Sequence, residues 1–155
     1  MSPPLPHPPA PGPPRSQTIG DAYLCCTNLN GSQQHNHAAA MARFSVAAMR
    51  AARETAVDPD DPRLGHVHMR IGIHSGPCMA SLVGKRNPKY TLMGDTINVA
   101  SRMESSGAPN WIQCSRRTAD LIRVQDPAIV LARRGEVQVR GGGACGGFRG
   151  HWARV

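Results

Sequence analysis

An α+β fold built on an antiparallel sheet is the fold class that the sequence predicts, and two observations support it. Short apolar stretches that alternate like strands are separated by turns containing glycine, which is the pattern of hairpins. Two longer stretches, at about 37–56 and 96–104, repeat their apolar residues with helical spacing instead. Because strands and helices mix with hairpins and do not alternate regularly, a doubly wound parallel sheet is not expected.

Length and composition limit the class of protein. The chain has 155 residues, enough for one domain with a modest core, and only 4% are aromatic, so the core should be aliphatic. A formal net charge of +8 favours anionic partners such as nucleotides. The basic residues are scattered without aromatic residues among them, so no nucleic-acid partner is expected. With no signal peptide and no membrane segment, the chain is predicted to be cytoplasmic, with its five cysteines reduced.

The chain divides into two regions of different composition. Residues 1–15 are rich in proline and predict a disordered tail of polyproline type, with a ligand for a proline-binding module as the alternative. Residues 16–155 are predicted to form a single domain.

The first half of that domain is predicted to hold a hairpin and a long helix. The hairpin runs from Gln17 to Asn28 and turns at Gly20–Asp21. The exposed carboxylate of Asp21 could hold a hard cation, although an ordinary turn residue is the simpler interpretation. The helix spans about 37–56, and its expected buried side carries Met41, Phe44, Ala48 and Met49.

The second half is predicted to hold mostly strands. Strands at 67–74 and 78–84 are expected to pair as a hairpin through the turn at Ser75–Pro77. The other expected elements are a strand at 112–114, a helix from its N-cap Ser115 to about Val124, a hairpin of 129–132 with 136–139, and a last strand at 148–155. The glycine-rich 141–147 lacks the Lys–Ser/Thr ending of a P-loop and is predicted to be a flexible loop.

The stretch 90–104, YTLMGDTINVASRME, points most directly to chemistry. A tight turn is expected to lead into a helix that Asp95 or Thr96 caps. Asn98 and Arg102 are four residues apart, so they project from one face of this helix. An amide beside a guanidinium can bind a ribose and a phosphate, because the guanidinium fork fits phosphate oxygens. On spacing alone, an ordinary solvent-facing side is the favoured interpretation.

Four motifs in series, TIGDAY, RIGIHSGP, GDTINVASRME and RGEVQVRG, resemble the catalytic domain of class III purine nucleotide cyclases. The resemblance runs from about Gln17 to Trp152. It implies a ferredoxin-like α+β domain that forms a head-to-tail dimer, as a homodimer or as a heterodimer with another cyclase domain. It also implies conversion of GTP or ATP to the cyclic monophosphate and pyrophosphate, in the cytoplasm or at the cytoplasmic side of a membrane.

The resemblance assigns roles to individual residues. Asp21 matches one of the family's two metal-binding aspartates, which hold Mg²⁺ or Mn²⁺. Asn98 matches the residue that orients the ribose, and Arg102 matches the one that stabilises charge on the α-phosphate. In the family both come from the partner chain. Arg140 lies near the position of a lysine that contacts the terminal phosphates, although the family's KGKG is RGGG here.

The residues at the base-recognition positions fit either purine. In guanylyl cyclases the position of Gln17 is usually Glu and that of Thr91 is usually Cys, whereas adenylyl cyclases more often use Lys with Asp or Thr. The Gln17 amide and the Thr91 hydroxyl can each donate or accept a hydrogen bond, so guanine and adenine are both allowed. The sequences TIGDAYL and VASRMESSG resemble the guanylyl branch of the family slightly more than the adenylyl branch.

One family element has no counterpart in this sequence. The family's domain begins with a strand that carries the other metal aspartate, in a motif like DIVGFT, and the proline-rich tail stands in its place. The resemblance therefore implies a domain that is truncated at the N-terminus and has little activity alone. The alternatives are a non-catalytic half-site partner, which lends Asn98 and Arg102 to a complete cyclase, and an inactive fragment.

Overall fold

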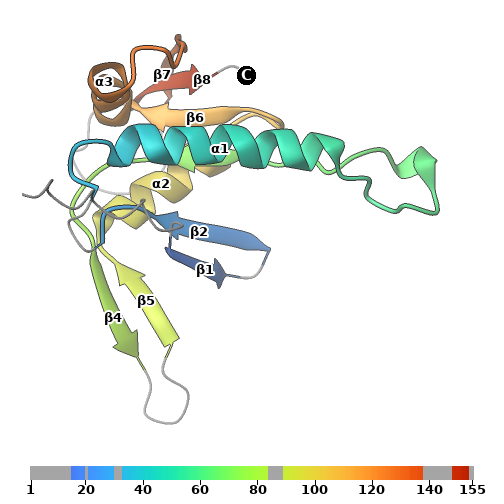
Figure 1. Ribbon diagram of the computed structural model, residues 1–155, viewed down its shortest axis with the longest axis horizontal. Helices are drawn as coiled ribbons and strands as arrows, with labels where there is room; N and C mark the ends of the chain where they lie inside the picture. Colours follow the sequence, from blue (N-terminus) through green and yellow to red (C-terminus); the bar gives the residue numbers. More distant parts are fainter. Residues whose placement is uncertain (1–14, 20, 30–32, 84–88, 138–147, 154–155) are drawn as a thin grey trace, which may run out of the picture.

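The computed structural model describes residues 15–19, 21–29, 33–83, 89–137 and 148–153. In these residues the elements are β1 (Arg15–Ile19), β2 (Ala22–Cys26), α1 (His37–Glu54), a short 3₁₀ helix (Pro62–Leu64), β3 (Ile71–Ile73), β4 (Met79–Val83), β5 (Lys89–Met93), α2 (Asp95–Ser105), β6 (Ile112–Ser115), α3 (Arg116–Gln125), β7 (Leu131–Val137) and β8 (Phe148–Ala153) (Figure 1). The predicted α+β class is confirmed.

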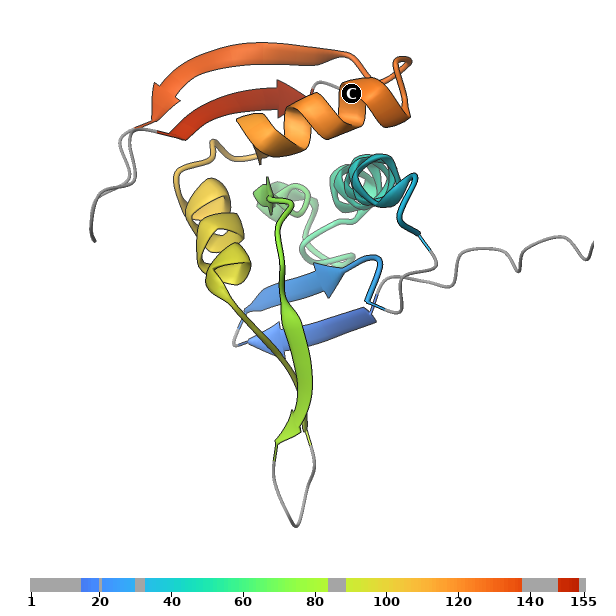
Figure 2. The ribbon, with the colours of Figure 1, turned by 90° about the vertical axis from the view of Figure 1, so that its left-hand side faces the viewer.

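The largest sheet has four strands in the order β3-β6-β8-β7. The β6–β8 and β7–β8 pairs are antiparallel, as expected, whereas β3 pairs with β6 in parallel, with Ile71 opposite Ile112. The sheet is therefore mixed. Helices α1 and α2 lie on either side of β3 (Figure 2), so this short strand carries the contacts of both.

The core is aliphatic and lies where α1 and α3 pack on β3 and β6. Its buried cluster consists of Ala38, Ala42, Met49, Ile73, Ile112, Cys114, Ala119 and Ile122. Met49 is buried as predicted, but the prediction for Phe44 is wrong, because its side chain is 38% exposed. The buried stripe of α1 runs through Ala38, Ala42, Ser45 and Met49, and Phe44 falls beside this stripe.

Two smaller sheets are hairpins. The predicted β1–β2 hairpin is confirmed, with Gln17 opposite Leu24. The predicted pairing of 67–74 with 78–84 is wrong: β4 pairs with β5, with Met79 opposite Met93, and β3 stays in the main sheet beside β6. The β4–β5 hairpin projects away from the helices (Figure 1).

The predicted hairpin of 129–132 with 136–139 is also wrong. The expected turn at Arg133–Gly135 lies inside the continuous strand β7, which pairs with β8 instead. The register shifts between Arg133 and Gly135. Gly135 therefore lies at a bulge in one strand and not in a turn between two. The last strand and the N-cap of α3 at Ser115, which accepts from the Thr118 amide, are confirmed.

Candidate functional site

The helix α2 begins at a glycine that makes a close backbone turn. Gly94 is the N-cap with a φ of 136°, a region that favours glycine, and a Cβ there would lie 3.2 Å from the Pro77 carbonyl oxygen. The predicted cap by Asp95 or Thr96 is wrong, since no side chain caps this helix. Thr96 instead donates its hydroxyl to the Pro77 carbonyl at 2.6 Å, which fixes the start of α2 to the segment before β4.

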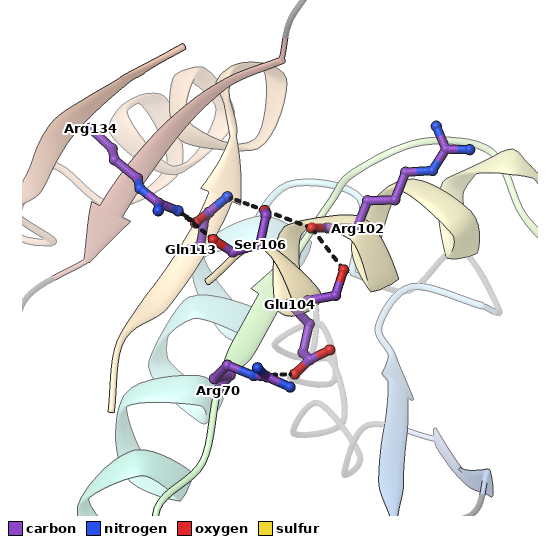
Figure 3. Close-up of polar contacts among 7 residues, drawn as sticks. Arg70, Arg102, Glu104, Ser106, Gln113 and Arg134 are labelled. Atoms are coloured by element: carbon purple, nitrogen blue, oxygen red, sulfur yellow. Dashed lines mark hydrogen bonds and ion pairs between the residues drawn. The ribbon is translucent and has the colours of Figure 1, made fainter. Parts of the chain in front are cut away.

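Asn98 and Arg102 lie on α2 away from its buried side. Val99 and Met103 are buried, whereas Asn98 is exposed and Arg102 is half-buried. The predicted spacing is therefore realised: an amide and a guanidinium project one helical turn apart from a rigid element. In Figure 3 the guanidinium of Arg102 points away from the polar network at the end of the helix.

That network holds the C-terminal end of α2. The Ser106 hydroxyl donates to the Arg102 carbonyl at 2.7 Å, and the Gln113 amide donates to the Ser106 hydroxyl at 3.0 Å (Figure 3). Arg134 donates to the Gln113 side-chain oxygen and, at 2.7 Å, to the Ser106 carbonyl. Gln113 is 0% exposed. The backbone of Arg102 is therefore held from two strands of the main sheet, β6 and β7.

The middle of α2 packs directly on the backbone of β3. A Cβ on Gly72 would lie 2.2 Å from the Glu104 nitrogen and 2.4 Å from the Ala100 carbonyl oxygen. Arg70 adds an ion pair with Glu104 at 2.8 Å. The sequence interpretation missed these positioning residues. A glycine inside the strand motif RIGI was the available signal, because such a glycine often marks a close backbone approach.

The other predicted site residues lie on different elements. Asp21 is exposed at the turn end of the β1–β2 hairpin, and Gln17 lies in β1. Thr91 is half-buried in β5 opposite Ser81, on the hairpin face that also carries Met79 and Met93. Arg140 lies outside the described residues. The structure thus brings together Asn98 and Arg102, and places Asp21 and Thr91 on two separate hairpins.

A divalent cation such as Mg²⁺ needs several oxygen ligands. In the part of the chain that the structure describes, no group of three or more His, Cys, Asp or Glu side chains is placed to hold a metal ion. Asp21 alone is a single exposed carboxylate, and Mg²⁺ or Mn²⁺ held by two aspartates would need a second one. Among the described residues, Asp21 is the one carboxylate that the family motifs assign to a metal.

A cavity of about 310 Å³ lies beside the start of α2. Its walls come from the end of β2, the start of α1, the segment 73–78 and the first turns of α2. His74 on this wall shares a hydrogen bond of 2.7 Å between its Nδ1 and the Ser115 hydroxyl. Burial and, to a smaller extent, the charge of Arg117 lower the pKa of His74, so the imidazole is neutral at pH 7.

Comparison with known proteins identifies the family. The model of the adenylate and guanylate cyclase catalytic domain matches residues 14–152. The chain belongs to this family. The resemblance carried by the four motifs is thereby confirmed. Among the described residues of this cyclase domain, no helix is both long and apolar enough to cross a membrane.

Similar proteins include receptor cyclases and solved cyclase domains. Retinal guanylyl cyclase 1 of Homo sapiens is 39% identical over 130 residues, which cover 83% of this chain and 11% of that protein. Receptor-type guanylate cyclase gcy-13 of Caenorhabditis elegans is 40% identical over 127 residues, covering 82% and 12%. The cyclase domain therefore spans about a tenth of the length of these curated relatives.

Two solved structures confirm the cyclase fold. The guanylate cyclase domain of RhGC from Catenaria anguillulae, in complex with GTP, has a TM-score of 0.75 and 29% identity, covering 90% of this chain and 70% of that chain. A non-canonical dimeric guanylyl cyclase domain of the RhoGC fusion protein from Blastocladiella emersonii has a TM-score of 0.73 and 29% identity, covering 88% of this chain and 68% of that chain.

Proposed function

We propose that this chain is a guanylate cyclase module, which takes part in forming cyclic GMP and pyrophosphate from GTP in signal transduction. One observation carries the proposal: Asn98 and Arg102 project from one helix whose start, middle and end are all held by the rest of the fold. Catalytic groups need such rigid support, because a misplacement of about 1 Å can cost about 100-fold in rate.

The chemistry is an in-line displacement at the α-phosphorus of the nucleotide. The ribose 3′-oxygen forms a bond to this phosphorus, the bond to the bridging oxygen breaks, and pyrophosphate leaves while the 3′-hydroxyl proton passes to solvent. Arg102 donates to the α-phosphate oxygens on which negative charge develops, and Asn98 orients the ribose by a hydrogen bond. Both residues serve the nucleotide bound by a second cyclase domain.

GTP is the proposed substrate in preference to ATP. The guanylyl cyclases among the similar proteins support this choice. In this assignment the side-chain carbonyl of Gln17 accepts from the guanine N–H groups, and the Thr91 hydroxyl donates to the guanine oxygen. Adenylate cyclase activity is the alternative outcome. In that case the Gln17 side-chain N–H donates to adenine, and the Thr91 oxygen accepts from it.

A head-to-tail dimer is proposed as the working assembly. Met79 is 72% exposed, and Met93 opposite it is also exposed, so the projecting β4–β5 hairpin presents apolar side chains to solvent. Thr91 lies on the same face, so a partner that covers these methionines also closes over a base-recognition residue. The similar RhoGC domain, a non-canonical dimer, supports dimer formation as such, and the head-to-tail geometry rests on the family resemblance.

Mg²⁺ or Mn²⁺ is the proposed cofactor, and it would neutralise the charge of the triphosphate when bound. Asp21 would be one ligand, and the motif that carries the family's other metal aspartate has no counterpart in this sequence. The single assigned aspartate favours a second candidate function: the chain is a half-site partner that supplies Asn98 and Arg102 to a complete cyclase.

The test measures cyclic nucleotide formation by the purified chain with Mn²⁺, given GTP and ATP in separate reactions. The chain is assayed alone and mixed with a full-length cyclase whose own Asn and Arg at the two matching positions are replaced. Product from the chain alone supports a complete enzyme. Product only in the mixture, and its loss with Arg102→Ala, supports the half-site partner. A folded chain that forms no product in either assay would overturn both candidates.

A further inference from the structure

Two cysteines from separate parts of the chain meet in the wall of the cavity beside α2. Cys26 is the last residue of β2, and Cys78 directly precedes β4. Their sulfur atoms lie 3.7 Å apart, although the residues are 52 positions apart in the sequence. Both side chains are half-buried, and both line the cavity of about 310 Å³. Neither residue has a part in the proposed cyclase chemistry.

The other described cysteines are placed differently with respect to Cys78. Cys25 is also half-buried and contributes to the cavity wall, but it precedes Cys26 in a strand, so its side chain leaves the opposite face of β2. Cys114 is buried in the core cluster of the main sheet. Among the described residues, the thiol pair within hydrogen-bonding distance is that of Cys26 and Cys78. Proximity in the folded chain therefore selects this one pair.

We propose that Cys26 and Cys78 form a thiol modification site, which a small-molecule disulfide such as oxidised glutathione converts to an intramolecular disulfide. A disulfide requires an S–S distance of about 2.05 Å, so the sulfur atoms must move closer from 3.7 Å. The move is small because Cys26 ends its strand and Cys78 belongs to the connection before β4. The adjoining cavity gives the glutathione reagent access to the pair.

The exchange proceeds in two balanced steps. A protein thiolate attacks one sulfur of oxidised glutathione, which forms a mixed disulfide and releases one reduced glutathione. The second protein thiol loses its proton to solvent and attacks the protein sulfur of the mixed disulfide, which releases the second reduced glutathione. Two protein thiols are thereby oxidised, and one glutathione disulfide is reduced to two thiols.

Burial affects the rate of this exchange. It raises the pKa of Cys26 to about 12, with further contributions from the hydrogen bond and charge of Cys78. Only a small fraction of Cys26 is therefore thiolate at neutral pH, so the cross-link should form faster as the pH rises.

The disulfide would join two parts of the fold that hold different site residues. The β1–β2 hairpin that ends at Cys26 carries Asp21 at its turn. Cys78 follows Pro77, whose carbonyl accepts the Thr96 hydroxyl at the start of α2. Oxidation therefore links the β1–β2 hairpin, which carries Asp21, covalently to the segment before β4. That segment contacts the start of α2, the helix of Asn98 and Arg102. We expect a rise in Tm on the order of 10 °C, because the disulfide restricts a long loop in the unfolded chain.

The experiment incubates the folded full chain with oxidised glutathione, blocks the remaining thiols with N-ethylmaleimide and maps the peptides by mass spectrometry. The expected product contains a peptide joining Cys26 to Cys78, and a Cys26→Ser variant stops at glutathione bound to Cys78. Cys25→Ser is the matched control and should form the cross-link at an unchanged rate. The same treatment in concentrated urea should give mixed pairings, because the folded geometry no longer selects the pair.

Two results would overturn the proposal. One is the absence of a cross-link between Cys26 and Cys78 in the folded chain, and the other is an equal yield of a cross-link from Cys25. The Tm is measured before and after oxidation as a second readout, with Cys78→Ser expected to show no rise. Neither readout depends on cyclase activity, so a failure of the proposed function leaves this test intact.

Discussion

Gly72 of β3 lies directly against Glu104 of α2, so closely that a Cβ on the glycine would stand 2.2 Å from the Glu104 backbone nitrogen. This contact sets the distance between the main sheet and the helix that carries Asn98 and Arg102. Because the opposing atoms belong to the helix backbone, no side-chain rotation can make room for a larger residue at this position.

Gly72→Ala should therefore displace α2 from the sheet. We expect the free energy of unfolding to fall by roughly 3 kcal/mol, a typical cost of forcing an extra carbon into a packed interface. Urea unfolding of both proteins measures this loss. Ala100→Gly is the matched test of the cause: it removes a neighbouring methyl group but leaves the clashing carbonyl, so it should not rescue Gly72→Ala. Rescue would show that the contact is with side chains.

Gln113→Leu should weaken the C-terminal end of α2. The buried Gln113 amide connects Arg134 to Ser106, whose hydroxyl holds the Arg102 carbonyl. Its replacement removes the Gln113 hydrogen bonds to Arg134 and to Ser106, and a loss of about 1–3 kcal/mol in unfolding free energy is expected. A double-mutant cycle with Ser106→Ala measures the coupling. Additive losses would contradict a shared network.

Arg102→Lys should lower the rate of cyclic GMP formation by roughly 100-fold in the assay that first shows activity, because lysine keeps the charge and loses the planar fork of donors. The bond from the Ser106 hydroxyl to the backbone carbonyl of Arg102 is kept in this variant, so the end of α2 should stay in place. Arg116→Lys is the matched control on α3, where an exposed ion pair with Asp120 spans 3.8 Å. An equal loss of rate in both variants would contradict the assignment of Arg102 to the active site.

Local signals in the sequence were enough to predict several elements. The Gly–Asp step predicted the β1–β2 hairpin, and Ser115 predicted the start of α3, because each signal acts within a few residues of itself. The spacing of Asn98 and Arg102 likewise follows from helical geometry alone. The roles of these two residues came from the family motif, since an exposed polar face has many uses.

Pairings between distant residues could not be predicted in the same way. The strand motif RIGIHSGP gives no local sign that β3 takes β6 as its partner and leaves β4 to β5. The bulge at Gly135 and a turn at Gly135 have the same sequence signature. Gly72 acts through its contact with Glu104, and Gln113 through its bond with Arg134, which is 21 positions further along the chain. Their positioning roles therefore emerge only when the chain is folded.

The stability of the cyclase domain should depend on the protonation of His74. Burial and the charge of Arg117 lower the pKa of this imidazole, while Asp95 opposes them weakly. In the unfolded chain the imidazole binds its proton near pH 6.5, whereas the folded protein binds it only at a lower pH. The unfolded state therefore binds more protons in this window, and the stability from His74 is present above pH 6.5 and is lost as the pH falls.

Urea unfolding midpoints at pH 7.5, 6.5 and 5.5 test this dependence on wild type and His74→Asn. The advantage of wild type at pH 7.5 should shrink at pH 5.5, with a slope of at most about 1.4 kcal/mol per pH unit for one proton. Arg117→Gln removes one cause of the lowered pKa and should make the slope shallower. Parallel pH curves for wild type and His74→Asn would mean that the Ser115 hydrogen bond adapts to the imidazolium, because its hydroxyl can accept as well as donate.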